Sequence, residues 1–323
     1  MMSAAYKLED YTAPLATRRF ELIQIGEPGF FLETCIYGAP HPKLRPLLII
    51  HPLEFPIPPS VAFCEHLYQS GHQVIFARRP GFGASSPLHR SLYEEDLIRS
   101  GTTVATEAIM FKRLTEALEL NNFSVMSLGS ANPTGYRLAA LSAHVTHCLL
   151  INPMFNDIIW AAFRPAWFHR MMAQLIKSRS GLWLADQGLK LLIKRDPTAF
   201  YRQFYQSSVA DLDYLYQNEQ DFIAARDPMV DVASHIIYAD TILNLSQDPI
   251  LKDGRLGDLN ATCVAGTDSH ADWKAGMARE AHRLGAEFTL ASSGDLCCAY
   301  ANPDFILSLL QPARVSAPVH TTS

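Results

Sequence analysis

Between Arg18 and Ile151, short runs rich in strand-forming residues alternate with longer helical patterns. The apolar runs Phe20–Ile25 and Phe30–Tyr37 flank the turn sequence Glu27-Pro28-Gly29, which predicts an antiparallel hairpin. Leu47–His51 and Val74–Ala77 are apolar without interruption. Such runs are typical of strands that are covered on both faces.

Longer segments with a helical period separate these strands from the next ones. Helices are predicted at Val61–Gln69, Thr103–Leu120 and Pro133–Ala143, and strands at Phe123–Leu128 and Val145–Ile151. Repeated strand–helix–strand units favour a mostly parallel sheet with helices on both faces. The fold class is therefore predicted to be α/β.

The pattern changes after residue 152 and returns about a hundred residues later. Between 153 and 255 it is almost wholly helical, with an amphipathic helix at Leu182–Lys194. Strands and helices then alternate again, at Ala261–Ala265, Trp273–Leu284, Glu287–Ala291 and Pro303–Leu310. We therefore expect a core domain in two parts, 1–152 and 256–312, a helical cap at 153–255 and a flexible tail at 313–323.

Composition narrows the functional classes. The 323 residues are 48% hydrophobic and 18% charged, as in ordinary globular proteins, and the net charge of −5 does not favour nucleic-acid binding. No apolar run reaches the roughly 20 residues of a membrane span, and the first ten residues lack a signal-peptide core. The six scattered cysteines are typical of reduced thiols, and no metal-binding spacing occurs. We expect a cytoplasmic protein without cofactor or metal; homo-oligomerisation is left open.

Two loop sequences resemble those of the α/β-hydrolase family. His51-Pro52-Leu53-Glu54-Phe55-Pro56 follows a buried strand, where that family has a His-Gly-x-Pro oxyanion loop. Pro80-Gly81-Phe82-Gly83-Ala84-Ser85 is very similar to the family's Pro-Gly-x-Gly-x-Ser turn. With the order of strands and the helical insertion, the resemblance covers nearly the whole chain. It implies the α/β-hydrolase fold, with a Ser-His-Asp triad as the usual catalytic machinery.

The resemblance also implies a position for the nucleophile. In the family, a strand leads into Gly-x-Ser-x-Gly and a helix follows directly. Here the corresponding turn is Gly129-Ser130-Ala131-Asn132-Pro133, so the nucleophile position falls on Ala131, which has no reactive group. A shift of register would instead make Ser130 or Ser127 the nucleophile.

The family's acid and base positions follow the last two strands. Asp268 lies at the position of the triad carboxylate, with Asp272 as a rival, and Asp295 lies at the position of the histidine. A carboxylate is a poor base for a serine hydroxyl near pH 7, but two neighbouring carboxylates can share a proton. His270 is the candidate substitute for the missing imidazole.

Other parts of the site are implied by the same resemblance. The backbone amides of Leu53 and Asn132 are the expected oxyanion donors, although Pro52 replaces the usual loop glycine and puts the geometry at Leu53 in doubt. His51 belongs to the oxyanion loop, where the family histidine is structural. The expected pocket residues, besides His51, are aromatic: Phe155, Trp160, Phe163, Trp167, Phe204 and Tyr205.

Three functional hypotheses follow. The first is a protein that binds a small apolar molecule containing a carbonyl group and acts on it, if at all, by non-hydrolytic or non-standard chemistry. The second is an ester, thioester or lactone hydrolase that uses Ser130 or Ser127 with His270 and Asp268. The third is a binding protein without catalytic activity.

Overall fold

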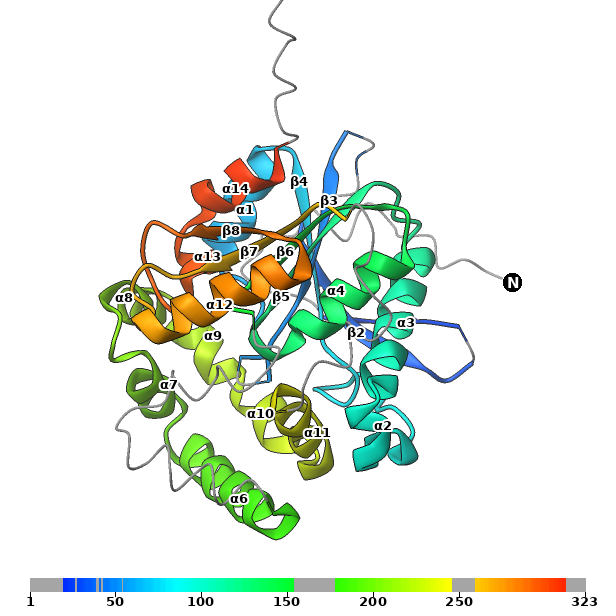
Figure 1. Ribbon diagram of the computed structural model, residues 1–323, viewed down its shortest axis with the longest axis vertical. Helices are drawn as coiled ribbons and strands as arrows, with labels where there is room; N and C mark the ends of the chain where they lie inside the picture. The colour runs from blue at the N-terminus through cyan, green and yellow to red at the C-terminus, as the bar shows by residue number, and fades with distance from the viewer. Residues whose placement is uncertain are drawn as a thin grey trace, which may run out of the picture.

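An eight-stranded sheet forms the centre of the protein (Figure 1). The computed structural model describes residues 20–26, 28–38, 41, 43–53, 55–153, 178–245 and 259–311, without the side chains of 242–245. The strands are β1 (Glu21–Gln24), β2 (Phe31–Ile36), β3 (Arg45–Ile50), β4 (His72–Ala77), β5 (Phe123–Leu128), β6 (Val145–Ile151), β7 (Ala261–Ala265) and β8 (Glu287–Leu290). Their order is β1-β2-β4-β3-β5-β6-β7-β8, in which β2 runs antiparallel to β1 and β4 and all the later pairs are parallel.

Helices cover both faces of this sheet. One face carries α1 (Val61–Gln69) and α14 (Pro303–Leu310). The other carries α3 (Thr102–Ala117), α4 (Asn132–Leu141) and α12 (Ala271–Leu284). The predicted α/β class and its two helical layers are thereby confirmed.

The uninterrupted apolar strands supply both layers of the core. In β3, Leu47 and Ile49 pack into the cluster that contains residues of α1, whereas Leu48 and Ile50 pack into the cluster with α3. All four side chains are fully buried. Successive strand residues point to opposite faces, so a strand covered on both sides needs an apolar residue at every position.

A second group of helices lies between β6 and β7 in the chain and gathers at one end of the sheet (Figure 1). These helices are α6 (Arg179–Arg195), α7 (Pro197–Tyr205), α8 (Val209–Gln217), α9 (Glu219–Ala224), α10 (Arg226–Asp231) and α11 (Ser234–Leu245). Aromatic side chains join them to the core. Phe55, in the loop after β3, lies 5.0 Å from Phe222 and 5.9 Å from Tyr201 between ring centroids.

The predicted helices and strands are all present, with ends displaced by at most a few residues. Four short elements of the described chain were not predicted: η2 (Arg90–Tyr93), α2 (Glu95–Arg99), η3 (Gly129–Ala131) and α13 (Cys298–Ala301). Elements of one turn are too short to display a hydrophobic period. The domain boundaries stay predictions, because residues 154–177, 246–258 and 312–323 lie outside the described residues. Within the described part of the chain, no helix has the length and apolar character that crossing a membrane requires.

Helix α4 packs against β5 at a glycine, and this contact is open to a test. A Cβ atom on Gly135 would lie 2.3 Å from the Ser127 hydroxyl oxygen. We expect Gly135→Ala to lower the free energy of unfolding by about 1–3 kcal/mol, because the helix must move away from the strand. Urea denaturation measures the loss.

Two further variants control this prediction. Gly188→Ala, in α6, is the matched control because a Cβ there meets nothing within 4 Å; it should stabilise the protein slightly through helix propensity. Gly135→Ala should cost much less in a Ser127→Gly background, where the side chain that the new methyl group would meet is absent, than in the wild type. Equal stabilities for the two single alanine variants would contradict this account of the contact.

Candidate functional site

The junction between β5 and α4 bends at a glycine. Gly129 has φ of 49°, in the left-handed region that favours glycine, and the short helix η3 begins there. Ala131 has ordinary helical angles, and its methyl group is fully buried in the core cluster on the α3 side. Pro133 lies in the first turn of α4, as predicted. The sharp bend is therefore two residues before Ala131.

The hydroxyl group of Ser127 has a structural partner. It donates to the side-chain oxygen of Asn132 at 3.0 Å, and the amide nitrogen of Asn132 donates to the carbonyls of Gly129 and Ile151 at 2.7 and 2.8 Å. Both polar side chains are fully buried. They tie β5, the bend and β6 together.

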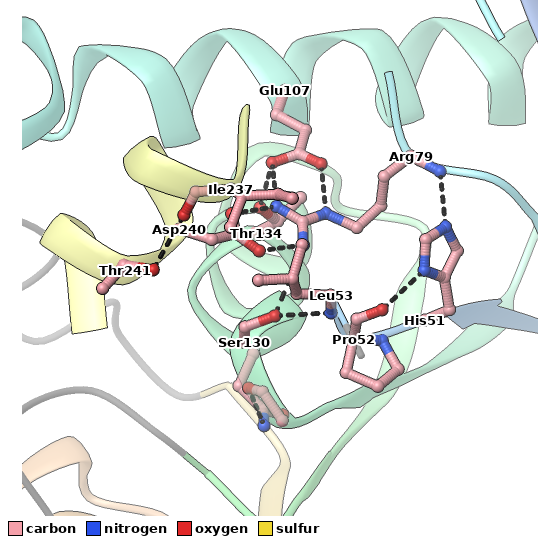
Figure 2. A network of polar contacts seen from close by, with 12 residues as sticks. His51, Pro52, Leu53, Arg79, Glu107, Ser130, Thr134, Ile237, Asp240 and Thr241 are labelled. Atoms are coloured by element: carbon pink, nitrogen blue, oxygen red, sulfur yellow. Dashed lines mark hydrogen bonds and ion pairs between the residues drawn. The ribbon is translucent and has the colours of Figure 1, made fainter. Parts of the chain in front are cut away.

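Ser130 points the other way, toward the loop after β3 (Figure 2). Its hydroxyl oxygen accepts the backbone N–H of Leu53 at 2.8 Å and a guanidinium N–H of Arg79 at 3.4 Å. The side chain is almost completely buried. In the described part of the chain, no imidazole hydrogen-bonds to this hydroxyl.

Neither predicted oxyanion donor is free. The Leu53 amide is paired with Ser130, and the backbone N–H of Asn132 donates to the carbonyl of Gly129. The expectation that both amides point at an open position for a substrate oxygen is therefore wrong. The Leu53 amide donates to the serine hydroxyl, and the Asn132 amide closes the helical turn.

His51 supports the loop, as predicted for a structural histidine. Its Nε2 atom accepts the backbone N–H of Arg79 at 2.9 Å, so Nδ1 carries the proton and donates to the carbonyl of Pro52 at 2.8 Å. Burial and the nearby Arg79 charge hold the pKa of His51 well below its usual value. The ring stacks on Phe76 and meets Phe82 edge-on. It lines no described cavity.

Arg79 forms a buried ionic network above the bend (Figure 2). Its Nε donates to Glu107 of α3 at 2.6 Å, and its two terminal nitrogens donate to Asp240 of α11, also at 2.6 Å. Thr134 donates its hydroxyl to Glu107 at 2.9 Å. Burial alone lowers the pKa of the guanidinium, but Asp240 and Glu107 outweigh it and hold that pKa well above its usual value.

A small cavity of about 20 Å³ adjoins this network. Arg79, Glu107 and Asp240 form its polar side. The rest of the wall is mostly apolar, with Leu88, Tyr93, Ile98, Val104, Ile236 and Ala239. A cavity of this size holds about one water-sized molecule.

The carboxylates predicted near the ends of β7 and β8 do lie together. Asp268 accepts the backbone N–H of Gly294 at 3.1 Å and the hydroxyl of Ser208 at 2.8 Å. Asp295 accepts the hydroxyl of Ser269. Burial raises the pKa of Asp295, and the negative charge of Asp268 raises it further.

A third carboxylate, Asp211 of α8, completes this cluster. It accepts the backbone N–H groups of Asp295, Leu296 and Cys297 at 3.0, 2.7 and 3.3 Å. Burial raises the pKa of Asp211 to about 7, although the three amides act in the opposite direction. Asp211 thus holds the inserted helices to the loop after β8.

Comparisons with known proteins identify the fold. No protein-family model and no curated protein matches the chain. An enol-lactonase from Burkholderia xenovorans LB400 is similar, with a TM-score of 0.57, 14% identity and coverage of 90% of this chain and 99% of that one. A bromoperoxidase from Bacillus anthracis has a TM-score of 0.57 at 17% identity, over 91% and 100% of the two chains. An esterase from Exiguobacterium antarcticum has a TM-score of 0.55 at 15% identity, over 90% and 97%.

The chain has the α/β-hydrolase fold. In the α/β-hydrolase fold the nucleophile occupies the strained turn between strand and helix. The positive φ lies at Gly129, two residues before Ala131, so this geometry does not favour Ala131 as the nucleophile position, which stays a prediction. Both residues lack a nucleophilic group. The sequence pattern favours Ala131 because Gly129 resembles the first glycine of the motif; in the structure, Gly135 of α4 makes room for the side chain of Ser127.

The remaining predicted residues lie outside this α/β-hydrolase-type site or outside the described chain. His270 caps the N-terminus of α12 by accepting the backbone N–H of Asp272, and its side chain is exposed. Tyr205 is buried among the aromatic rings of the core, and Phe204 packs beside them, so neither lines the described cavity. Phe155, Trp160, Phe163 and Trp167 lie outside the described residues. No described group of three or more histidine, cysteine or acidic side chains has the arrangement of a metal site.

The residues of the ionic network were not predicted from the sequence. A signal was present at Glu107, which lies on the apolar face of its helix beside Val104 and Ala108. A second was Asp240, which stands in the otherwise apolar segment of α11. A charge on an apolar helix face indicates a buried partner. Asp211 offered no comparable signal.

The ionic network predicts a large effect on stability. Replacing the guanidinium by an apolar chain, Arg79→Met, leaves two buried carboxylates without a cation. We expect the free energy of unfolding to fall by about 3–5 kcal/mol in urea denaturation. Adding Glu107→Met and Asp240→Leu to the same chain should recover most of the loss. A loss below about 1 kcal/mol for Arg79→Met would contradict the network.

Asp211 predicts a particular dependence of stability on pH. Its folded pKa of about 7 lies above the unfolded value, so the folded protein binds more protons between about pH 4 and pH 7. The contribution of Asp211 is therefore fully present at the acid end and lost as the pH rises through 7. Asp295 has the same sign, and His51 has the opposite sign because its pKa is lowered.

The comparison of wild type with Asp211→Asn isolates this contribution. Denaturation at a series of pH values from 5 to 8 should show a steeper decline for the wild type than for Asp211→Asn. Parallel curves for the two proteins would mean that Asp211 does not titrate in this range.

Proposed function

We propose that this α/β-hydrolase-fold protein binds a small molecule without forming a covalent acyl-enzyme. One observation carries the proposal: the strained turn that presents the nucleophile in this fold is occupied by Gly129. Glycine has no side chain that can attack a carbonyl carbon. Any reaction at this site must therefore proceed by positioning or proton transfer alone.

The neighbouring hydroxyl groups support the same proposal. Ser127 is engaged with Asn132, and Ser130 accepts hydrogen bonds from Leu53 and Arg79. A serine becomes a nucleophile when an adjacent base takes its proton. The partners of Ser130 are donors, and His270, the histidine considered for this role, caps a helix instead.

The cavity beside Arg79 is the proposed binding site. Its mostly apolar wall suits an apolar part of a ligand, and its volume of about 20 Å³ limits the ligand to a very small molecule. The carbonyl group expected from the sequence has little support, because the Leu53 and Asn132 amides are both engaged. The proposal therefore requires a small ligand with room for an apolar part and does not require a carbonyl.

A second candidate is acid–base chemistry at Asp268 and Asp295. The observation in its favour is the raised pKa of Asp295, which burial and Asp268 together produce. A carboxyl group that keeps its proton closer to neutral pH can donate it to a bound substrate. Hydrogen bonds from Ser269 and from the amide of Gly294 occupy part of this pair. We therefore rank it below simple binding.

Labelling with a fluorophosphonate probe tests the proposal. We expect no stoichiometric labelling of the wild-type protein, because the turn has no hydroxyl and Ser130 is buried. Intact-protein mass spectrometry measures the adduct. Stoichiometric labelling that Ser130→Ala abolishes, and that the matched variant Ser127→Ala retains, would instead establish a serine hydrolase.

A further inference from the structure

The guanidinium of Arg79 has no hydrogen-bond donor left for a ligand. Nε donates to Glu107, one terminal nitrogen to Asp240 and Ser130, and the other to Glu107 and Asp240. An arginine side chain has five N–H donors in total. A carboxylate or phosphate entering the adjoining cavity therefore finds no free guanidinium donor, which argues against an anionic ligand.

The acceptors of the same network are not all used. Two carboxylates offer about eight acceptor positions. Arg79 and Thr134 fill three of them at Glu107, and Arg79 fills two at Asp240. About three positions stay open among the described residues. They belong to carboxylates that line the cavity.

The net charge of the network also favours a cationic ligand. One guanidinium faces two carboxylates, and all three side chains are at most 8% exposed. Ionised, the group carries a net charge of −1 in a mostly apolar surrounding. A buried charge without compensation is costly, so a cation at the open acceptors would stabilise the folded protein.

We propose that the cavity between Arg79, Glu107 and Asp240 binds ammonium or a small primary amine as a cation. Its N–H groups would donate to the open carboxylate positions, and its charge would neutralise the network. The cavity of about 20 Å³ fits the ammonium group itself. The apolar wall, with Val104 and Ala239, then faces a short alkyl substituent. The inference rests on the proposed function, because it names the ligand class of the same cavity.

The thermal stability of the full chain tests this proposal. Melting curves are recorded with increasing ammonium or methylammonium chloride while sodium chloride holds the ionic strength constant. At about five times the Kd, we expect Tm to rise by about 2–4 °C for both cations, with saturation. Tetramethylammonium, which has no N–H donor and is too large, should give no rise.

Variants separate the cavity from general salt effects. Asp240→Asn removes the excess charge and should abolish the rise. Ala239→Val narrows the cavity without changing a charge. It should lower the apparent affinity for the amine by at least about fivefold, seen as a smaller rise in Tm at the same concentration. This variant tests the cavity even if Asp240→Asn fails to fold. Glu33→Gln is the matched control, because Glu33 and Arg78, at 2.8 Å, form an ion pair of one carboxylate and one guanidinium away from the cavity; Glu33 also accepts the backbone N–H of Ala84. It should keep the full response.

Several outcomes would overturn the inference. Equal effects of ammonium and tetramethylammonium, or a full response in Ala239→Val, would exclude a specific site. A saturable effect of a small neutral molecule alone would refute the amine while leaving the proposed function intact, whereas fluorophosphonate labelling of Ser130 refutes that function directly.

Discussion

The pairing of one buried guanidinium with two carboxylates determines how the main parts of this protein meet. Arg79 lies just beyond β4, Glu107 is on α3, and Asp240 is on α11 of the inserted helices. A charge in this position is tolerated only when hydrogen bonds and opposite charges surround it. The three elements must therefore approach within hydrogen-bond distance, which sets the position of α11 at the end of the sheet (Figure 2).

The same network changes what the junction after β5 can do. In a serine hydrolase, a hydroxyl and nearby amides are directed toward the substrate. Here the Ser130 hydroxyl links Leu53 to Arg79, so the polar groups of the junction serve the protein's own structure. The residue with the positive φ at this junction, Gly129, has no side chain, and the neighbouring donors are engaged within the protein.

Two carboxylates hold the inserted helices to the core in different ways. Asp240 is paired with a guanidinium, whereas in the described part of the chain the carboxylate of Asp211 accepts backbone N–H groups. Amides alone do not offset the burial of a charge, and the pKa of Asp211 is raised to about 7. The contact at α8 is therefore sensitive to pH near neutrality, while the contact at α11 depends on the pairing of opposite charges.

The fold could be predicted from the sequence because its signals are local. A parallel sheet covered on both faces needs uninterrupted apolar strands, such as Leu47–Ile50, with helices between them. Both patterns can be recognised in the sequence without knowing how the rest of the chain folds. The sequence placed Asp268 and Asp295 after the last two strands, and the pairing of β7 with β8 brings them together. The tertiary structure alone decided that the turn bends at Gly129 and not at Ala131. That choice depends on how Gly135 of α4 admits the Ser127 side chain, a contact between elements that no residue pattern displays. It also decided the partners of Arg79, because the pairing of charges far apart in sequence is set by which helix faces meet when the core is packed.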